Sequence, residues 1–289
     1  MMALNEPAPV DLRINTFKST REDVQEQLAK ADIACEPTSL SPIGLRLQAR
    51  PRVTHTQLFK DGLFEVQDEG SQLAALLTDA RAGMTVIDYC AGAGGKTLAL
   101  VNAMIEDDRF DGMFWACDIT VSRLRELEKR ATRNGTIEAI HPHVLQDDAA
   151  GDAGNAWLRD NANLADRVLA DVPCTGSGAW RRDPENRWRL TPDTLQGYSE
   201  RQRNILTKAA SLVKTGGRLV YVTCSILPAE NEVQISWFLE THPAFSVMPV
   251  TDIWARIIGS TPLTSKPTLR LSPSSSQTDG FFIAILQKT

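Results

Sequence analysis

The sequence of 289 residues contains no stretch near the roughly 20 apolar residues that a membrane-spanning helix needs. Its first residues also lack the charged and then apolar layout of a secretory signal. We therefore expect a protein of the cytoplasm with no membrane partner. Cysteine is scarce as well: the five cysteines include no Cys-x-x-Cys pair, which argues against a disulfide framework and a structural zinc site. The four histidines lie apart from the motifs below, and we expect no metal.

A large excess of either charge is also missing. The net charge is −5, and 42% hydrophobic with 23% charged residues is typical of a soluble globular protein, not of a strongly basic nucleic-acid binder. Residues 175–218 depart from this average, because they hold nine basic and four acidic side chains, a local balance of +5. This region is a candidate contact for an anionic partner, and a solvated face with ordinary salt bridges is the alternative. We expect a monomer.

The hydrophobic pattern divides the chain into two parts. Residues 1–62 hold strand-like segments at 12–17 and 44–47 and a helix that Ser19 or Thr20 can cap, which predicts a small α+β cap. In residues 63–289, buried strands alternate with helices, which predicts a parallel sheet and an α/β fold of the Rossmann-like kind. We expect strands at 85–90, 114–118, 167–172 and 218–224. We expect helices that begin near Glu69, Lys96, Val121, Thr194 and Glu230, and we expect Gly83 to end the helix that begins near Glu69. Antiparallel edge strands should include residues 281–286.

A glycine turn follows the first of these strands, in the order Cys90, Ala91, Gly92, Ala93, Gly94, Gly95, Lys96, Thr97. Such a turn presents backbone N–H groups and the positive end of a helix dipole to a polar or anionic ligand. A phosphate-binding loop would need glycine at Cys90, and a dinucleotide fingerprint would need glycine at Thr97. Methyltransferases use the same layout for S-adenosylmethionine, with a carboxylate at the next strand end, where Asp118 stands. We favour this cofactor over a turn made only for close packing.

Reactive side chains follow the later strands. Gln146, Asp147 and Asp148 stand at the end of a further strand, between those at 114–118 and 167–172, and one of them could reach an adenine amino group. Asp171 and Cys174 lie at the end of the strand at 167–172, and Cys224 ends the strand at 218–224. Because ligands gather at the carboxyl edge of such sheets, we expect these groups beside the cofactor, with inert buried thiols as the alternative for each cysteine.

Two thiols and an acid suit methylation at carbon 5 of a pyrimidine. That carbon is too weak a nucleophile to take a methyl group until a thiolate has added to carbon 6, an acid assists at ring nitrogen 3, and a base later removes the proton on carbon 5. Asp171 fits the role of the acid, whereas either cysteine could be the nucleophile on this reasoning. Methylation of an exocyclic amino group usually shows an aromatic residue where Cys174 stands, so it is disfavoured.

The sequence resembles the RNA 5-methylcytosine methyltransferases of the RsmB and NSUN family. The resemblance extends from about Leu12 to Leu286, and the order and spacing of its motifs carry it. These are FEVQDEGS (64–71), DYCAGAGGKT (88–97), DVPCTGSG (171–178) with RRDP (181–184), VTCS (222–225) and ENE (230–232).

The resemblance implies that Cys224 is the nucleophile and that Cys174 assists release of the methylated RNA, with Asp171 and Lys96 also catalytic. It implies that S-adenosylmethionine contacts residues 90–96 of the glycine turn together with Asp118, Asp148 and Asp171, Asp147 being the alternative to Asp148. It also implies an RNA partner, held by the cap and by the basic residues that follow the catalytic loop, namely Arg181, Arg182, Arg187 and Arg189, with Trp180 and Trp188 between them to stack bases.

The sequence departs from the family pattern in two places. Gly92 and Ala93 stand where Ala-Pro is common, and residues 273–282 have serine and glutamine where relatives often carry histidine. The resemblance also begins at the cap, without the helical RNA-binding domain that precedes it in the bacterial ribosomal enzymes. That difference leaves the exact RNA substrate open, and we expect ribosomal RNA first and transfer RNA second. An RNA-binding assembly factor without turnover and an enzyme that acts on DNA are the competing functions.

Overall fold

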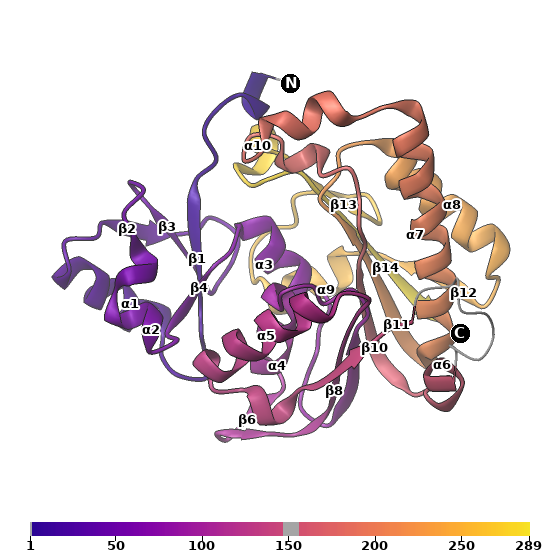
Figure 1. Cartoon of the computed structure of the whole chain (residues 1–289), viewed down its shortest axis with the longest axis horizontal. Helices are drawn as coiled ribbons and strands as arrows, with labels where there is room; N and C mark the ends of the chain where they lie inside the picture. Colours follow the sequence, from indigo (N-terminus) through magenta and orange to yellow (C-terminus); the bar gives the residue numbers. More distant parts are fainter. Residues whose placement is uncertain (1, 147–155) are drawn as a thin grey trace.

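The computed structural model describes residues 2–146 and 156–289, and a small N-terminal module lies beside a larger α/β domain (Figure 1). The module is a four-stranded antiparallel sheet in the order β2-β3-β1-β4. Its sheet reaches past residue 62, the predicted end of the cap, because β4 pairs with β1. The elements are β1 (Val10–Ile14), α1 (Arg21–Lys30), β2 (Cys35–Pro37), β3 (Gly44–Leu47), α2 (Gln57–Lys60) and β4 (Phe64–Val66).

The predicted strand and helix pattern of the module is confirmed. The side chain of Thr20 accepts a hydrogen bond from the backbone N–H of Asp23 at 3.2 Å, which caps α1. Val24 and Leu28 of α1, one helical turn apart, pack on Leu12 and Phe64 of the sheet, and all four side chains are fully buried. The module therefore has a hydrophobic core of its own.

The large domain is built on one mixed sheet. Its strand order is β12-β14-β11-β10-β5-β8-β9, with β13 paired to β14 at the side. Strands β9, β8, β5, β10 and β11 are parallel, and β14 runs antiparallel to β11. The strands of this sheet are β5 (Met84–Asp88), β8 (Gly112–Asp118), β9 (His141–Val144), β10 (Ala165–Asp171), β11 (Val213–Thr223), β12 (Phe245–Met248), β13 (Leu269–Leu271) and β14 (Phe281–Lys288), and a separate hairpin joins β6 (Ile105–Glu106) to β7 (Arg109–Phe110).

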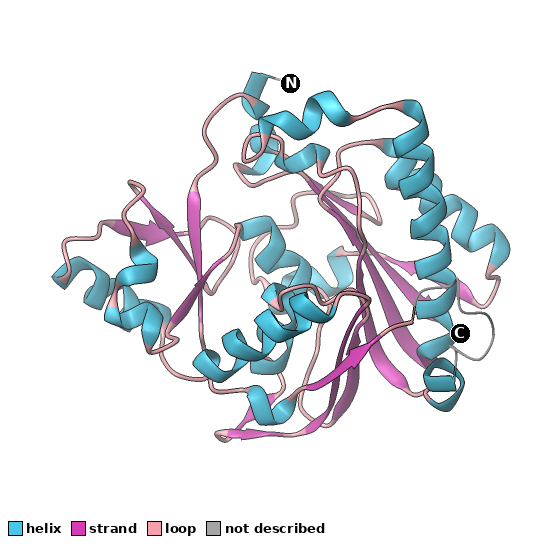
Figure 2. Cartoon of the chain, viewed as in Figure 1, coloured by secondary structure: helices cyan, strands magenta, loops and turns pink. Residues whose placement is uncertain are grey.

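Helices cover both faces of this sheet (Figure 2). One core joins α3, α4, α5 and α9 to side chains such as Val86 and Leu169, and the other joins α7 and α8 to their neighbours Ile87 and Val168. Successive strand residues thus face opposite layers, as a parallel sheet buried on both faces requires. The helices are α3 (Glu69–Leu76), α4 (Gly95–Asn102), α5 (Val121–Asn134), α6 (Ala156–Asp160), α7 (Pro192–Leu212), α8 (Glu232–Thr241), α9 (Thr251–Ile257) and α10 (Pro273–Ser276).

The predicted strands and helices of the large domain are all present, and two details differ. Helix α3 ends at Leu76, and Gly83 instead adopts φ +78° in the turn that leads into β5. Strand β14 is antiparallel as predicted but is not at the edge, because it lies between β11 and β12 and is buried over residues 281–286. Within the described residues, no helix is long and apolar enough to cross a membrane.

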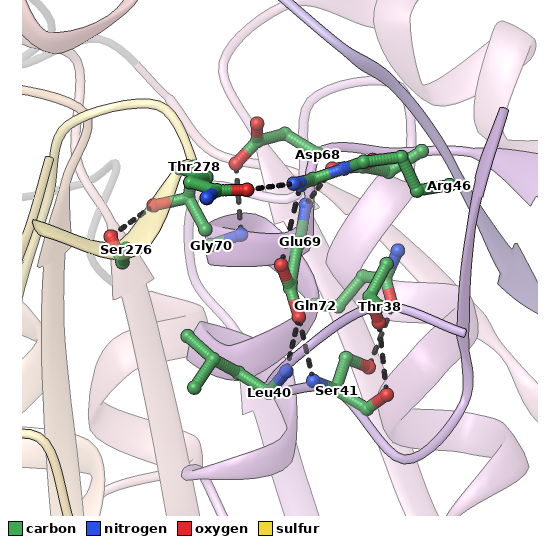
Figure 3. A network of polar contacts seen from close by, with 12 residues as sticks. Thr38, Leu40, Ser41, Arg46, Asp68, Glu69, Gly70, Gln72, Ser276 and Thr278 are labelled. Carbon is green, nitrogen blue, oxygen red and sulfur yellow. Dashed lines mark hydrogen bonds and ion pairs between the residues drawn. The ribbon is translucent and has the colours of Figure 1, made fainter. Parts of the chain in front are cut away.

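A buried polar network joins the module to the large domain (Figure 3). The Glu69 carboxylate, at the start of α3, accepts the backbone N–H groups of Leu40 and Ser41 at 2.6 and 2.9 Å. It also pairs with Arg46 of β3 at 3.3 Å, and Arg46 pairs in turn with Asp11 of β1 at 2.7 Å. We call this set the junction network. It holds the first helix of the large domain against the sheet of the module.

Candidate active site

A cavity of about 720 Å³ opens at the carboxyl ends of β5, β8, β10 and β11. Ligand sites of α/β sheets lie at this edge, and the volume is within the range of small-molecule pockets. Predicted site residues that line it are Cys90, Ala91, Gly92, Ala93, Gly95, Lys96, Asp118, Asp171, Cys174 and Cys224. The predicted contact at Asp148, and its alternative Asp147, lie outside the described residues.

The glycine turn between β5 and α4 uses its glycines for two different purposes. Gly92 has φ +54° and nothing lies within 4 Å of the place where a Cβ would stand, so its backbone is open to the cavity. Gly94 has φ +86°, and a Cβ there would come within 2.6 Å of the Leu127 side chain on α5. Gly94 does not line the cavity, and its part is to let α4 pack on α5.

Two carboxylates lie under this turn. Asp118 ends β8, and its two oxygens accept the backbone N–H groups of Gly92 at 2.9 Å and Thr120 at 2.7 Å. Asp88 ends β5 and is fully buried, with one oxygen bound to the Thr97 hydroxyl at 2.7 Å and the other without a hydrogen-bond partner. Burial raises the pKa of Asp88 to about 7. A buried oxygen without a partner at the cavity wall has room for a donor from a ligand.

Lys96 and Asp171 form an ion pair across the cavity, with Nζ and Oδ2 2.6 Å apart. The Lys96 side chain is 9% exposed, whereas the Asp171 side chain is 31% exposed, and both residues line the cavity. Burial alone would lower the pKa of Lys96, but the charge of Asp171 and their hydrogen bond raise it above its usual value. Lys96 therefore brings a positive charge to the cavity wall.

The sulfur atoms of Cys174 and Cys224 lie 3.4 Å apart, which brings together the two thiols that the sequence placed on neighbouring strands. The hydrogen bond to Cys224, and then burial, raises the pKa of Cys174 well above its usual value. Lys96 lies close enough to Cys224 for the two groups to interact, which also raises the pKa of Lys96. Burial likewise raises the pKa of Cys90 and Cys117, which keeps both as thiols.

A third buried carboxylate, which sequence reasoning missed as a site residue, holds the two cysteine loops together. Glu230 is fully buried and accepts the backbone N–H and the hydroxyl of Thr175 at 2.9 and 2.6 Å, and Gln202 of α7 at 3.0 Å. The hydroxyls of Ser177 and Ser225 meet at 2.9 Å beside it. The only signal in the sequence was that Glu230 belongs to the last motif of the resemblance.

The N-terminal module also reaches the glycine turn, through residues that the sequence gave no reason to select. Arg13 of β1, 1% exposed, donates to Gln67 at 2.6 Å and to the backbone carbonyl of Gly95. Burial lowers the pKa of Arg13 to about 10. Arg130 of α5 donates to the carbonyl of Ala93 at 2.8 Å and pairs with Glu65 of β4. The module therefore helps to shape the glycine-turn side of the cavity.

The four arginines predicted to contact RNA divide into two pairs. Arg181 is only 4% exposed and pairs with Asp279 at 2.6 Å, and Arg182 pairs with Asp279 and with Asp68 at 3.0 Å. Their guanidinium groups tie the loop after Cys174 to the C-terminal loop, and the RNA contact predicted for both arginines stays a prediction. Arg187 and Arg189 are exposed, as is Trp188 at 83%. Among the described residues, no group of side chains is arranged to hold a metal ion.

Comparison with known proteins adds to this geometry. The chain is 34% identical over 285 residues to the "Probable ribosomal RNA small subunit methyltransferase B" of Synechocystis, covering 98% of this chain and 61% of that protein. A crystal structure of a methyltransferase homologue from Pyrococcus horikoshii matches with a TM-score of 0.80 and 28% identity over 100% of this chain and 89% of the other. The structure of NSun6 from the same organism with SFG shares the fold, with a TM-score of 0.82 and 20% identity over 99% of this chain and 92% of the other.

Two family models match. Residues 1–54 match the ferredoxin-like domain of RsmF/B-like methyltransferases, and residues 75–287 match the 16S rRNA methyltransferase RsmB/F model. These matches confirm the predicted Rossmann-like class I methyltransferase fold with a small N-terminal α+β module. The chain spans about three fifths of the length of the curated relatives it matches. It belongs to the RsmB/F family of S-adenosylmethionine-dependent methyltransferases.

Proposed function

We propose that this protein transfers a methyl group from S-adenosylmethionine to carbon 5 of a cytosine in RNA, with Cys224 as the nucleophile. The observation that carries the proposal is the pair of sulfurs 3.4 Å apart, facing the same cavity as the Lys96–Asp171 ion pair. Methylation of an amino group or of ribose needs no covalent help from a thiol. A site with two thiols, an acid and a cation is the set that carbon 5 chemistry needs.

The cavity residues fit the cofactor. Each oxygen of Asp118 accepts one backbone N–H and has lone-pair capacity left for a ribose hydroxyl. The unpartnered oxygen of Asp88 and the open backbone at Gly92 supply further polar contacts. When bound, S-adenosylmethionine supplies an electrophilic methyl group. Support for this cofactor comes from family membership and from the SFG-bound NSun6 structure that shares the fold.

Cys224, Asp171 and Lys96 each act on a different atom or proton of the base. The Cys224 thiolate adds to carbon 6, which forms a C–S bond and moves an electron pair from the ring double bond toward ring nitrogen 3. The proton that ring nitrogen 3 takes comes from the Lys96 ammonium and passes through the Asp171 carboxylate, to which Lys96 is hydrogen-bonded at 2.6 Å. Carbon 5 is then nucleophilic toward the methyl group that the cofactor would supply. After transfer, a base takes the carbon 5 proton, the C–H electron pair re-forms the ring double bond, and the C–S bond breaks with its electron pair returning to Cys224. The proton on ring nitrogen 3 returns through Asp171 to Lys96.

Charge favours Cys224 over Cys174 for the attack. The hydrogen bond to Cys224, and then burial, raises the pKa of Cys174. The Lys96 ammonium interacts with Cys224, so a thiolate at Cys224 has a cationic neighbour. Once Cys224 is bonded to the base it no longer carries charge, so Cys174 becomes free to ionise and to assist the release step.

The RNA is expected to meet the cavity along the exposed part of residues 184–189. Arg187 and Arg189 provide phosphate contacts, and the Trp188 ring provides a stacking surface. The target cytosine has to leave its stack to reach Cys224, which favours a single-stranded or looped site. We propose ribosomal RNA first, on the printed names of the relatives, and transfer RNA second. Location in the cytoplasm and a monomeric state stay predictions.

The test is to incubate purified protein and its Cys224→Ala variant with total RNA and S-adenosylmethionine, and to map 5-methylcytosine by bisulfite sequencing. We expect new 5-methylcytosine at one or a few sites with the wild type and none with the variant. RNA in which every cytosine stays unmethylated, or methyl groups found only on amino nitrogens, would contradict the proposal. Retention of RNA binding and cellular function by Cys224→Ala would favour the assembly factor, and equal use of DNA would contradict an RNA enzyme.

A further inference from the structure

Helix α7 forms a second wall of the cavity at the carboxyl ends of the strands. Tyr198, Arg201, Ile205 and Lys208 are spaced three or four residues apart, which places them on one face of the helix, and all four line the cavity. The buried side chains of α7, such as Leu206, pack on the sheet instead. We call the face toward the cavity the α7 wall.

The α7 wall belongs to the side of the cavity that holds the two thiols. Helix α7 packs on β10 and β11, the strands that the two site cysteines follow, whereas the glycine turn follows β5. The side chain of Gln202, next to Arg201, donates to the carbonyl of Pro173 at 3.1 Å. Pro173 directly precedes Cys174, so this bond fixes the turn of helix that carries Arg201 beside the loop that carries Cys174.

Arg201 is an exposed cation on this wall without a carboxylate partner. Within residues 2–146 and 156–289, its side chain makes no ion pair and no hydrogen bond, and its guanidinium carbon lies 5.9 Å from the centre of the Tyr198 ring. A cation at this distance over an aromatic ring is attracted to it, so Tyr198 holds the guanidinium at the cavity wall. Lys96, by comparison, is paired with Asp171. The charge of Arg201 is therefore available to an anionic group of a ligand.

Both the cofactor and the RNA carry an anionic group, but their charges differ. In S-adenosylmethionine the carboxylate is outnumbered by an ammonium and a sulfonium, so the net charge of the cofactor is positive. In RNA each nucleotide has a phosphate on either side, and these phosphates stay at the mouth of the cavity when the base turns into it. A guanidinium matches a phosphate with two parallel N–H groups. An unpaired arginine on the thiol side therefore suits the strand and not the cofactor.

We propose that Arg201 binds the phosphate next to the target cytosine, and that Tyr198 is a positioning residue that holds the Arg201 guanidinium toward the strand. The inference rests on the proposed function, because it takes the target cytosine to lie at Cys224. A cation on the thiol side retains the backbone of the strand while the base is out of its stack. Residues 184–189 lie on a different segment, so their phosphate contacts are further along the strand.

The test measures RNA binding to the whole protein by fluorescence anisotropy, without cofactor. The probe is a single-stranded 12-mer of adenosine with one central cytosine as its only pyrimidine. We expect Arg201→Gln to weaken binding about tenfold, the usual effect of losing a hydrogen bond to a charged group. The slope of log affinity against log salt should become less steep by about 0.7, which corresponds to one phosphate contact. A neutral methylphosphonate on one side of the cytosine should weaken wild-type binding as much, and should not weaken Arg201→Gln further.

Two further variants serve as the control and as the test of Tyr198. Arg109 is an exposed residue of β7, just before β8 begins and so at the opposite edge of the sheet, and Arg109→Gln should bind as the wild type does. Tyr198→Leu, which lacks the ring under the guanidinium, should weaken binding about threefold. Tyr198→Phe keeps the ring and should restore wild-type affinity. Thermal melts show that each variant is folded.

Equal affinity of Arg201→Gln and the wild type would overturn the proposal, as would a methylphosphonate effect that is absent from the wild type or persists in Arg201→Gln. Calorimetry with S-adenosylhomocysteine tests the other ligand. If Arg201→Gln weakens that binding and leaves RNA binding unchanged, Arg201 belongs to the cofactor. The two proposals fail separately, because RNA binding is measured without methyl transfer. Weaker RNA binding by Arg201→Gln, with no methyl transfer by the wild type, contradicts the proposed function only. Methyl transfer with unchanged RNA affinity in Arg201→Gln contradicts the role of Arg201 only.

Discussion

The junction network and the catalytic cavity both contain a carboxylate paired with a basic side chain, yet they differ in what surrounds the pair. Glu69 is fully buried, and both of its oxygens are taken by Arg46 and by two backbone N–H groups. Asp171 is 31% exposed and lines a cavity of about 720 Å³. An ion pair buried on all sides holds the fold together, whereas an ion pair at a cavity wall is open to a ligand. We therefore assign a structural role to Glu69 and propose a chemical role for Asp171.

The difference between a structural and a chemical ion pair is tested most directly with two ion pairs at opposite ends of β10. Asp171→Asn should slow methyl transfer by about 10²- to 10⁴-fold, the usual contribution of a positioned acid, and should barely change the melting temperature. The control is Asp166→Asn at the other end, where Asp166 pairs with Lys214 at 2.5 Å. It should leave the rate unchanged. Equal loss of rate in both variants would mean that the pairs act through the fold alone.

The junction network should respond in the opposite way. Glu69→Ala leaves Arg46 and two backbone N–H groups without their acceptor. We expect the free energy of unfolding to fall by about 3–5 kcal/mol, the usual cost of removing one partner of a buried pair. Urea unfolding measures it, and the exposed pair Arg189–Glu185 provides the control, because Glu185→Ala should change stability by less than about 1 kcal/mol. If Glu69→Ala changes the free energy of unfolding as little as Glu185→Ala does, the structural role assigned to the junction network is wrong.

Asp88 should make the free energy of unfolding of the protein depend on pH. Its pKa in the folded protein is about 7, against about 4 when unfolded, so only the unfolded chain releases this proton as the pH rises from 4 to 7. The stability contributed by this group is present below pH 4 and is lost toward pH 7. Relative to Asp88→Asn, the wild type should lose on the order of 1 kcal/mol for each pH unit.

Urea unfolding of both proteins at pH 5 and pH 7 checks this. Asp68, whose pKa burial and then Asp279 raise to about 6, is present in both and cancels. A difference in stability that stays constant with pH would contradict the assignment to Asp88.

The smallest effect is expected at Glu230, which positions Cys174. Hydrogen bonding to Cys224, burial and then the charge of Glu230 raise the pKa of Cys174. In a Cys224→Ala background, Glu230→Gln should therefore lower that pKa and make alkylation of Cys174 by iodoacetamide a few-fold faster at pH 8. Glu232→Gln, two residues away and partly exposed, is the control. If Glu230→Gln leaves the rate of Cys174 alkylation unchanged, the role of Glu230 is structural only.

Much of the site was predictable because parallel strands end at one edge. The hydrophobic pattern located β5, β8, β10 and β11, and the reactive residues that follow them, Asp118, Asp171, Cys174 and Cys224, meet in one cavity. The family resemblance added an order to the two thiols that spacing could not decide. Short-range features of this kind, a strand and the residues just after it, survive folding unchanged.

Long-range pairing was what the sequence could not reveal. Arg181 and Arg182 read as surface cations, but Asp68 and Asp279, more than 90 residues away in each direction, bury or bind them. Arg13 lies 82 residues before the carbonyl of Gly95 that it reaches. Strand β14 is interior because β12 and β13 pair with it, and a single apolar run does not show which neighbours will cover it.

The central claim, that Cys224 attacks the base while Cys174 keeps its proton, is tested most directly by trapping the covalent complex. Wild type, Cys174→Ala, Cys224→Ala and the double variant are incubated with RNA and S-adenosylmethionine and resolved on a denaturing gel. We predict a protein–RNA adduct that accumulates in Cys174→Ala, because release is impaired, and that is absent from Cys224→Ala and from the double variant. An adduct that forms in Cys224→Ala and requires Cys174 would contradict the account and reverse the roles of the two thiols.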